Sequence, residues 1–393
     1  MRLMLSLLAV LCATFAVAAT AGSNATGGSG YKLAGSWGKT GTGTGQFTGT
    51  GGLAVDARGN VYVADRDNNR VQVFSPSGSF LRKWGSIGGG NGQFTGADDI
   101  AVSPDGSIWV ADDGGSRFQQ FSSVGAFQTA VTLTSELARG VAVDANGDLL
   151  GAVEGSAKSG FRRFTAGSWA ASGGLFGGRS LMRADDVEVS PDRSIYLIRA
   201  GTQGGGDWLE RYSAGGHLQK KTKLGGGEGT RALAVDLDCN VLVSDWTTAG
   251  GFAKYSPSGK KLATAGLPYV TNDLAVGPKG DVYAKIQNQG IVRLAEDRSK
   301  PRAALVAGRV PVTGGAAKVK YTLSGVACPA QVSGVASLSG AVTGKAAVKV
   351  AAGKSTVLSI PARGSSGKAQ FKIVLKTNGR PTTQVASVNA TVR

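Results

Sequence analysis

Short apolar runs separated by glycine-containing turns recur along most of the chain. One such unit starts with an apolar run at Leu53–Val55 and turns at Asp56–Asn60. A second apolar run follows at Val61–Val63, and polar and apolar residues then alternate over Val71–Phe74. Alternation with a period of two predicts half-buried β-strands, and helical periodicity is absent. The pattern therefore predicts an all-β protein built from short strands.

The unit repeats, and its copies can be aligned along the chain. The segment Gly45–Gly49 returns as Gly92–Gly96, and the first strand of each unit is centred near residues 54, 101, 142, 188, 234 and 275. Four short strands in each unit of ~40–45 residues predict a β-propeller, here with six blades over residues 31–297. The sixth unit lacks a fourth strand, and Tyr31–Gly38 resembles one. We expect this N-terminal segment to complete the last blade.

Residues 45–85 resemble the NHL repeat. They contain Gly-x-Phe, Leu-Ala-Val-Asp, Gly-Asn-Val-Tyr-Val-Ala-Asp and Asn-x-Arg-Val-Gln-Val-Phe. The resemblance implies a six-bladed propeller with a recurring Asp and Arg pair. The matching positions are Asp65, Arg70, Asp112, Arg117 and Asp245. Because the pair recurs, we interpret it as a structural ion pair, with ligand contact as the alternative.

A second set of charged residues precedes the first strand of each unit. In a propeller these positions face one mouth of the central channel. The predicted mouth residues are Asp98, Asp99, Arg139, Asp185, Asp186, Arg231, Asn272 and Asp273. They form either a self-paired ring of Arg and carboxylates or a site for a polar ligand. A third alternative is a cation, with Ca²⁺ as the candidate, bound by Asp99, Asp186 and Asp273.

Composition divides the chain into segments. Residues 1–21 have the pattern of a signal peptide, and residues 22–30 that of a Gly/Ser/Thr linker. Residues 298–393 contain 15 Lys and Arg and no Asp or Glu, which accounts for most of the net charge of +17. Their alternating pattern predicts a small immunoglobulin-like β-sandwich.

This organisation predicts a secreted, extracytoplasmic protein that has no transmembrane span once it is mature. Of the three cysteines, Cys12 lies in the signal segment, and Cys239 and Cys328 are candidates for a disulfide.

Little in the sequence indicates catalysis. His217 is the only histidine and falls in an outer hairpin, which argues against zinc sites with several histidines and against a Ser-His-Asp triad. We therefore expect a non-catalytic, monomeric scaffold without a cofactor that binds a protein, peptide or polysaccharide at the channel mouth. The basic domain would bind an anionic cell-wall polymer or act as a spacer, and nucleic acid is not expected. The alternative is a metal-dependent hydrolase or lactonase that uses the channel-mouth carboxylates.

Overall fold

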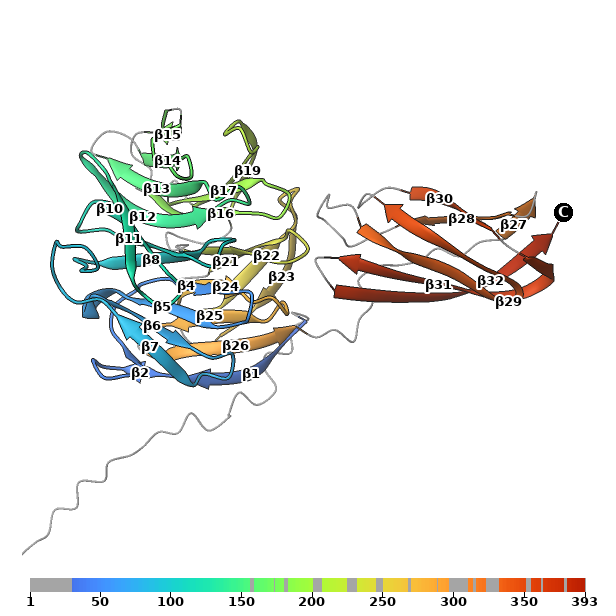
Figure 1. Cartoon of the computed structure of the whole chain (residues 1–393), viewed down its shortest axis with the longest axis horizontal. Coiled ribbons are helices and arrows are strands. Elements are labelled where there is room, and N and C mark those ends of the chain that lie inside the picture. Colours follow the sequence, from blue (N-terminus) through green and yellow to red (C-terminus); the bar gives the residue numbers. More distant parts are fainter. Residues whose placement is uncertain are drawn as a thin grey trace, which may run out of the picture.

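The computed structural model describes a six-bladed propeller and a separate C-terminal sheet (Figure 1). The described residues are 30–155, 159–172, 174–179, 183–200, 207–224, 232–244, 250–267, 270–287, 289–296, 310–313, 316–322, 332–350, 355–361, 363–377 and 380–392. The predicted signal peptide and linker lie outside them. Within the described residues, no helix is long and apolar enough to cross a membrane.

Each of the first three blades is a four-stranded antiparallel sheet whose strands follow chain order. Blade 1 consists of β4 (Leu53–Val55), β5 (Val61–Asp65), β6 (Arg70–Phe74) and β7 (Phe80–Trp84). Blade 2 consists of β8 (Ala97–Val102), β9 (Ile108–Asp112), β10 (Arg117–Phe121) and β11 (Phe127–Thr132). Blade 3 consists of β12 (Glu136–Val143), β13 (Leu149–Gly155), β14 (Ser159–Phe164) and β15 (Phe176–Arg179).

The next two blades repeat this plan. Blade 4 consists of β16 (Arg183–Val189), β17 (Ile195–Ala200), β18 (Trp208–Tyr212) and β19 (Leu218–Lys223). Blade 5 consists of β20 (Leu233–Val235), β21 (Val241–Ser244), β22 (Phe252–Tyr255) and β23 (Lys261–Ala265). Two minor elements precede or interrupt blade 1: the short parallel pair β2 (Lys39–Thr40) and β3 (Gln46–Phe47), and the 3₁₀ turn η1 (Arg66–Asn68).

The sixth blade is closed by the N-terminal strand, as expected. It contains β24 (Thr271–Val276), β25 (Val282–Ile286), β26 (Gly290–Glu296) and, as its outermost strand, β1 (Tyr31–Trp37). β1 runs antiparallel to β26, with Tyr31 opposite Glu296 and Trp37 opposite Ile291. This pairing covers the edge that β26 would otherwise expose and joins the two ends of the propeller.

The core lies between blades rather than in one centre. Successive residues of an inner strand point to opposite neighbours: Leu53 packs with Ala275 and Tyr283 of blade 6, and Ala54 packs with Phe94 and Ile100 on the side of blade 2. This arrangement explains why the inner strands are short and apolar on both faces. It leaves the central channel to polar residues in the first half of the inner strands.

The C-terminal strands form a single hydrogen-bonded sheet, in the order β29, β31, β32, β27, β28 and β30. Their bounds are β27 (Val310–Thr313), β28 (Ala316–Thr322), β29 (Val332–Val350), β30 (Ser355–Pro361), β31 (Arg363–Thr377) and β32 (Arg380–Val392). The β structure agrees with the alternating sequence. The immunoglobulin-like arrangement stays a prediction.

Candidate functional site at the channel mouth

The predicted mouth residues that the structure describes lie in the first half of the inner strands rather than before them, and they meet in one cavity of about 190 Å³. Its walls include Asp98, Asp99, Arg139, Asp185, Asp186, Asn272 and Asp273, which sequence reasoning had placed at the channel mouth. Arg231, the remaining predicted member, lies outside the described residues. Thr50, Gly52, Arg66 and Ala232 complete the lining.

Three aspartates of alternate blades clamp the blades that follow them. Asp99 of blade 2 accepts a hydrogen bond from the backbone N–H of Val141 in blade 3 at 2.7 Å. Asp186 of blade 4 accepts one from Leu233 in blade 5 at 2.8 Å. Asp273 of blade 6 accepts one from Leu53 in blade 1. These three carboxylates, which we call the clamp aspartates, thus repeat one contact three times around the axis.

A small residue precedes each residue whose backbone N–H binds a clamp aspartate. Blades 1, 3 and 5 have Gly52, Gly140 and Ala232 there. A Cβ on Gly52 would lie 2.1 Å from Oδ1 of Asp99, and one on Gly140 would lie 2.8 Å from Cα of Asp186. Larger side chains at these two positions would therefore collide with a clamp aspartate. The alternation of acidic and small residues is a packing requirement of the channel.

Burial raises the pKa of every clamp aspartate. The pKa of Asp99 rises to about 7 because burial penalises its charged form. Burial raises the pKa of Asp186 well above its usual value, and the charges of Asp99 and Asp273 add to this. Asp273 responds in the same way to burial and to the charge of Asp99. At neutral pH Asp99 can therefore both give and take a proton.

Arginines and acids form an ion-pair network on one side of the mouth. Arg66 contacts Asp98 and Asp113, each at 2.9 Å, and Arg139 contacts Asp113 and Glu154, each at 2.8 Å. Arg139 is therefore paired with carboxylates, which is one of the two arrangements considered for the mouth residues. The side chains of Arg66 and Arg139 are 33% and 21% exposed, so both can still reach a ligand.

Sequence reasoning missed Arg66, Asp113 and Glu154. Arg66 and Asp113 each follow the last residue of the second strand of their blades, and Glu154 takes the corresponding place in the third. The repeat spacing contained this signal, because each residue stands one position after the repeat's Asp or its equivalent. The prediction for the mouth uses only the residues that come before the first apolar run of each unit.

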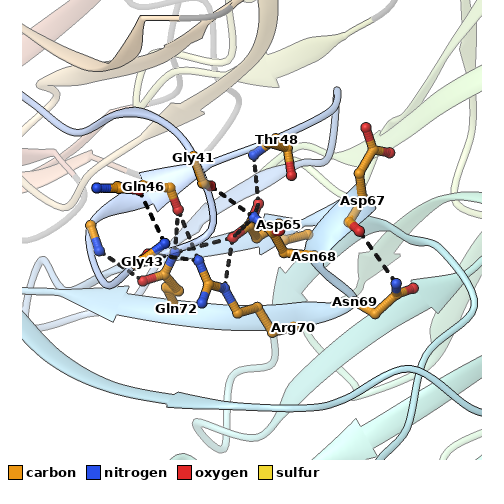
Figure 2. Close-up of polar contacts among 12 residues, drawn as sticks. Gly41, Gly43, Gln46, Thr48, Asp65, Asp67, Asn68, Asn69, Arg70 and Gln72 are labelled. Atoms are coloured by element: carbon orange, nitrogen blue, oxygen red, sulfur yellow. Dashed lines mark hydrogen bonds and ion pairs between the residues drawn. The ribbon is translucent and has the colours of Figure 1, made fainter.

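In blades 1 and 2 the recurring Asp and Arg pair joins the blade to the loop that leads into it, and Figure 2 shows the contacts in blade 1. Asp65 accepts hydrogen bonds from Arg70 at 2.8 Å and from the backbone N–H of Thr48 at 2.9 Å. Arg70 also donates to the carbonyl oxygens of Gly43 and Gln46. The second copy is nearly identical, with Asp112 bonded to Arg117 and to the N–H of Thr95.

In both copies the Asp is fully buried and its hydrogen bonds join strands to a loop. Asp245, the fifth-blade counterpart, lies outside the described residues. Blade 4 replaces the motif by a buried pair of inverted order, Arg199 with Glu210, at 2.7 Å.

The described residues do not fit a metal site. In the described part of the chain, no three His, Cys, Asp or Glu side chains lie together in an arrangement that could hold a metal ion. The clamp aspartates, the predicted ligands, already accept backbone N–H groups. His217 is exposed in the turn between β18 and β19. Cys239 is disulfide-bonded, and Cys328, its predicted partner, lies outside the described residues.

Comparison with known proteins supports the repeat assignment. The NHL repeat family model matches residues 51–74. Protein lin-41 of Caenorhabditis elegans is 51% identical over 47 residues, which are 12% of this chain and 4% of that protein. The E3 ubiquitin-protein ligase TRIM71 of Rattus norvegicus is 50% identical over 48 residues, or 12% of this chain and 6% of that protein. The chain is thus a six-bladed β-propeller that contains an NHL repeat.

Solved propellers match the fold over nearly their full length. A streptogramin B lyase superposes with a TM-score of 0.50 and 13% identity, covering 67% of this chain and 97% of the lyase. A putative gluconolactonase gives a TM-score of 0.51 and 17% identity, with coverage of 68% and 92%. A luciferin-regenerating enzyme gives 0.51 and 13%, with coverage of 67% and 94%. At these identities the likeness concerns the fold.

These matches correct our functional prediction. We expected a non-catalytic scaffold, chiefly because the chain has a single histidine and no familiar catalytic motif. The propellers with the same architecture are named as enzymes, so the scaffold prediction was wrong. The prediction rested on the single histidine and the absence of familiar motifs, but carboxyl groups with perturbed pKa values can also act as acids and bases.

Proposed function

We propose that the protein is a hydrolase that opens a small ester or lactone at the channel mouth, with the clamp aspartates as its acid–base groups. The observation that carries the proposal is the convergence of Asp99, Asp186 and Asp273 on one cavity, with pKa values raised by burial. Perturbed carboxyl groups in a concave site are typical of acid–base catalysis. The putative gluconolactonase among the similar folds makes lactones the first substrates to test.

The lining residues can be assigned the roles of general base, general acid and hydrogen-bond donor. With a pKa of about 7, Asp99 is partly ionised at neutral pH and can take a proton from a water that attacks the substrate carbonyl. Asp186, whose pKa is also raised by burial, can give a proton to the departing alkoxide oxygen as the carbon–oxygen bond breaks. Arg66 and Arg139 line the same cavity and can donate hydrogen bonds to the carbonyl oxygen as negative charge develops there. Water is consumed, and an acid and an alcohol are formed.

A substrate screen tests the proposal. Purified protein would be incubated with gluconolactone, dihydrocoumarin and para-nitrophenyl acetate, beside Asp99→Asn and Asp186→Asn. We expect turnover of at least one compound, with ~10²–10⁴-fold loss in each variant, the range for removal of an acid–base group. Arg58→Ala, an exposed change far from the cavity, is the matched control.

Absence of turnover on all three compounds, or equal turnover by wild type and both variants, would refute the proposal. Loss of activity with EDTA would replace acid–base catalysis by the carboxylates with a metal-dependent reaction. Export of the chain and binding of residues 298–393 to an anionic cell-wall polymer stay predictions from the sequence.

A further inference from the structure

The outermost strands of the six blades contain basic residues and no acidic ones. These strands are β1, β7, β11, β15, β19 and β23, and together they hold eight Lys and Arg and no Asp or Glu. The channel mouth, by contrast, is lined by five aspartates. Acidic and basic residues are therefore separated between the channel and the outer rim of the propeller.

Basic residues of the rim are concentrated on blades 4 and 5. We use the name rim lysines for four exposed residues of β19, β23 and the turn before β23: Lys220, Lys223, Lys260 and Lys261. None of the four forms an ion pair with another described residue, whereas their neighbour Lys221 lies 3.6 Å from Glu210. No Asp or Glu is exposed among the described residues of these two blades. The charge of the rim lysines is thus not compensated by the described part of the propeller.

Three of the rim lysines meet where blade 4 contacts blade 5. The turn that holds Lys260 packs against β19, because a Cβ on Gly259 would lie 3.4 Å from Cε of Lys220. Lys261 lies opposite Tyr255, which belongs to the core between the two blades. Residues directly opposite one another on antiparallel strands share a face, so Lys261 also faces blade 4. Like charges gathered in this way repel one another, and an anionic partner would relieve that repulsion.

Protection of the sheet edge does not account for this cluster. Lysine on an outer strand prevents pairing with another chain, and every blade would need that protection. The outer strand β11 of blade 2 nevertheless has no charged residue, whereas β19 has three lysines in six residues. The uneven distribution indicates a function specific to blades 4 and 5.

The chain itself has no acidic segment that could cover the rim lysines from outside the propeller. All 26 Asp and Glu lie between residues 31 and 297, so residues 1–30 and 298–393 contain none. The partner is therefore another molecule. Protein interfaces are depleted in Lys and enriched in Arg, whereas the lysine ammonium is a point charge that binds phosphate without a fixed orientation. Because the four charges extend along β19 and across to blade 5, they fit a chain of phosphates better than one small anion.

We propose that the rim of blades 4 and 5 binds a linear phosphate polymer through the rim lysines. Each ammonium group contacts a phosphate oxygen, and the release of counterions from the polymer favours binding, so the affinity falls as the salt concentration rises. None of the rim lysines lines the cavity at the channel mouth. Binding at the rim is therefore independent of the proposed hydrolysis.

Lysine labelling of the full-length protein tests the site residue by residue. The protein would be acetylated with a limiting amount of an amine-reactive ester, with and without long-chain polyphosphate, and each lysine would be followed by mass spectrometry. We expect polyphosphate to slow labelling of the rim lysines by about fivefold or more at low salt. Lys39, Lys83 and Lys279, which are exposed elsewhere on the propeller, are internal controls and should keep their rates. Protection confined to the lysines of residues 298–393, or equal protection of rim and control lysines, would overturn the proposal.

Two charge-matched variants of the full-length protein provide a second measurement. The rim variant combines Lys220→Gln, Lys223→Gln, Lys260→Gln and Lys261→Gln. The control variant removes the same charge from exposed positions elsewhere, with Lys39→Gln, Arg58→Gln, Lys83→Gln and Lys279→Gln. At about 0.7 per phosphate contact, the slope of log affinity for polyphosphate against log salt concentration should become shallower by about 3 in the rim variant and stay unchanged in the control.

Equal slopes in the two variants would show that only net charge matters, and the proposal would fail. It would also fail if wild-type protein bound phosphatidylglycerol vesicles through the rim lysines but did not bind polyphosphate, because the rim would then be a lipid-binding surface. Neither result bears on the hydrolase, which is tested by turnover at the channel mouth.

Discussion

The carboxylate of Asp186 and the backbone N–H of Leu233 are joined by a 2.8 Å hydrogen bond across the boundary between blades 4 and 5. The bond satisfies a buried backbone donor and at the same time holds a carboxyl group in the wall of the channel-mouth cavity. Structure and proposed chemistry therefore depend on the same side chain, and a substitution has to separate them.

Replacing Asp186 tests both roles. Asp186→Ala leaves the N–H of Leu233 without its acceptor, and we expect a loss of about 1–3 kcal/mol in the free energy of unfolding. Asp186→Asn keeps an oxygen acceptor and removes the charge, so its loss should be smaller. Urea denaturation at pH 7 measures both. Equal destabilisation by the two variants would show that the hydrogen bond from Leu233 to Asp186 does not contribute to the free energy of unfolding.

The NHL-type ion pair provides a second test. Arg70→Ala leaves the fully buried Asp65 without its cation, and Arg117→Ala does the same to Asp112 in blade 2. Breaking such a pair costs about 3–5 kcal/mol, so each variant should unfold at clearly lower urea concentration. The exposed Arg58→Ala is the control. If Arg70→Ala behaves like this control, the pair is not a stabilising element.

The small residues of the channel give a steric prediction. Gly52→Ala introduces a Cβ at 2.1 Å from Oδ1 of Asp99, so Asp99 has to move. We expect a loss of about 1–3 kcal/mol, typical of overpacking, and a displaced Asp99 resonance. Gly89→Ala is a matched control, because nothing lies within 4 Å of its added Cβ. Similar stability of the two variants would contradict the packing account of the alternation.

Stability should depend on pH in a defined way. The raised pKa values of Asp99, about 7, and Glu188, about 8, mean that the folded state holds more protons than the unfolded state above pH ~4. The free energy of unfolding should therefore fall as pH rises from about 4 to about 8. Burial lowers the pKa of Lys285 to about 8, so its contribution recovers between pH 8 and ~10. Thermal unfolding across this range should show a minimum near pH 8, with a shallower acid-side slope in Glu188→Ala.

Much of the fold could be predicted from the sequence because each blade repeats a local pattern. Gly59 and Gly78 adopt positive φ at the expected turns, and the match of Tyr31–Gly38 to a fourth strand was enough to predict closure. The ring residues Asp99, Asp186 and Asp273 were also found, because they occupy one position of the repeat. Their partners could not be found in this way. Hydrogen bonds to Val141, Leu233 and Leu53 depend on backbone placed by the neighbouring blade.

The function was harder to predict for a physical reason. The pKa of a carboxyl group depends on its burial and on charges across the channel, neither of which is visible in a single blade. Glu188 illustrates this: along the chain it is an irregular residue in a degenerate repeat, and only the register of all six blades shows that it replaces the alanine of the other five. A count of histidines cannot detect the acid–base chemistry that we propose for the carboxyl groups.

The pairing of β1 with β26 also has a consequence for biosynthesis. Tyr31 leaves the ribosome long before its partner Glu296 is made. Strand β1 therefore stays unpaired while five blades and most of the sixth are synthesised. During that time its edge is available to other chains. The ring closes only when the last propeller strand emerges, so a nascent chain that ends before β26 keeps an open edge. Ribosome-bound chains of increasing length should therefore acquire full protease resistance in one late step.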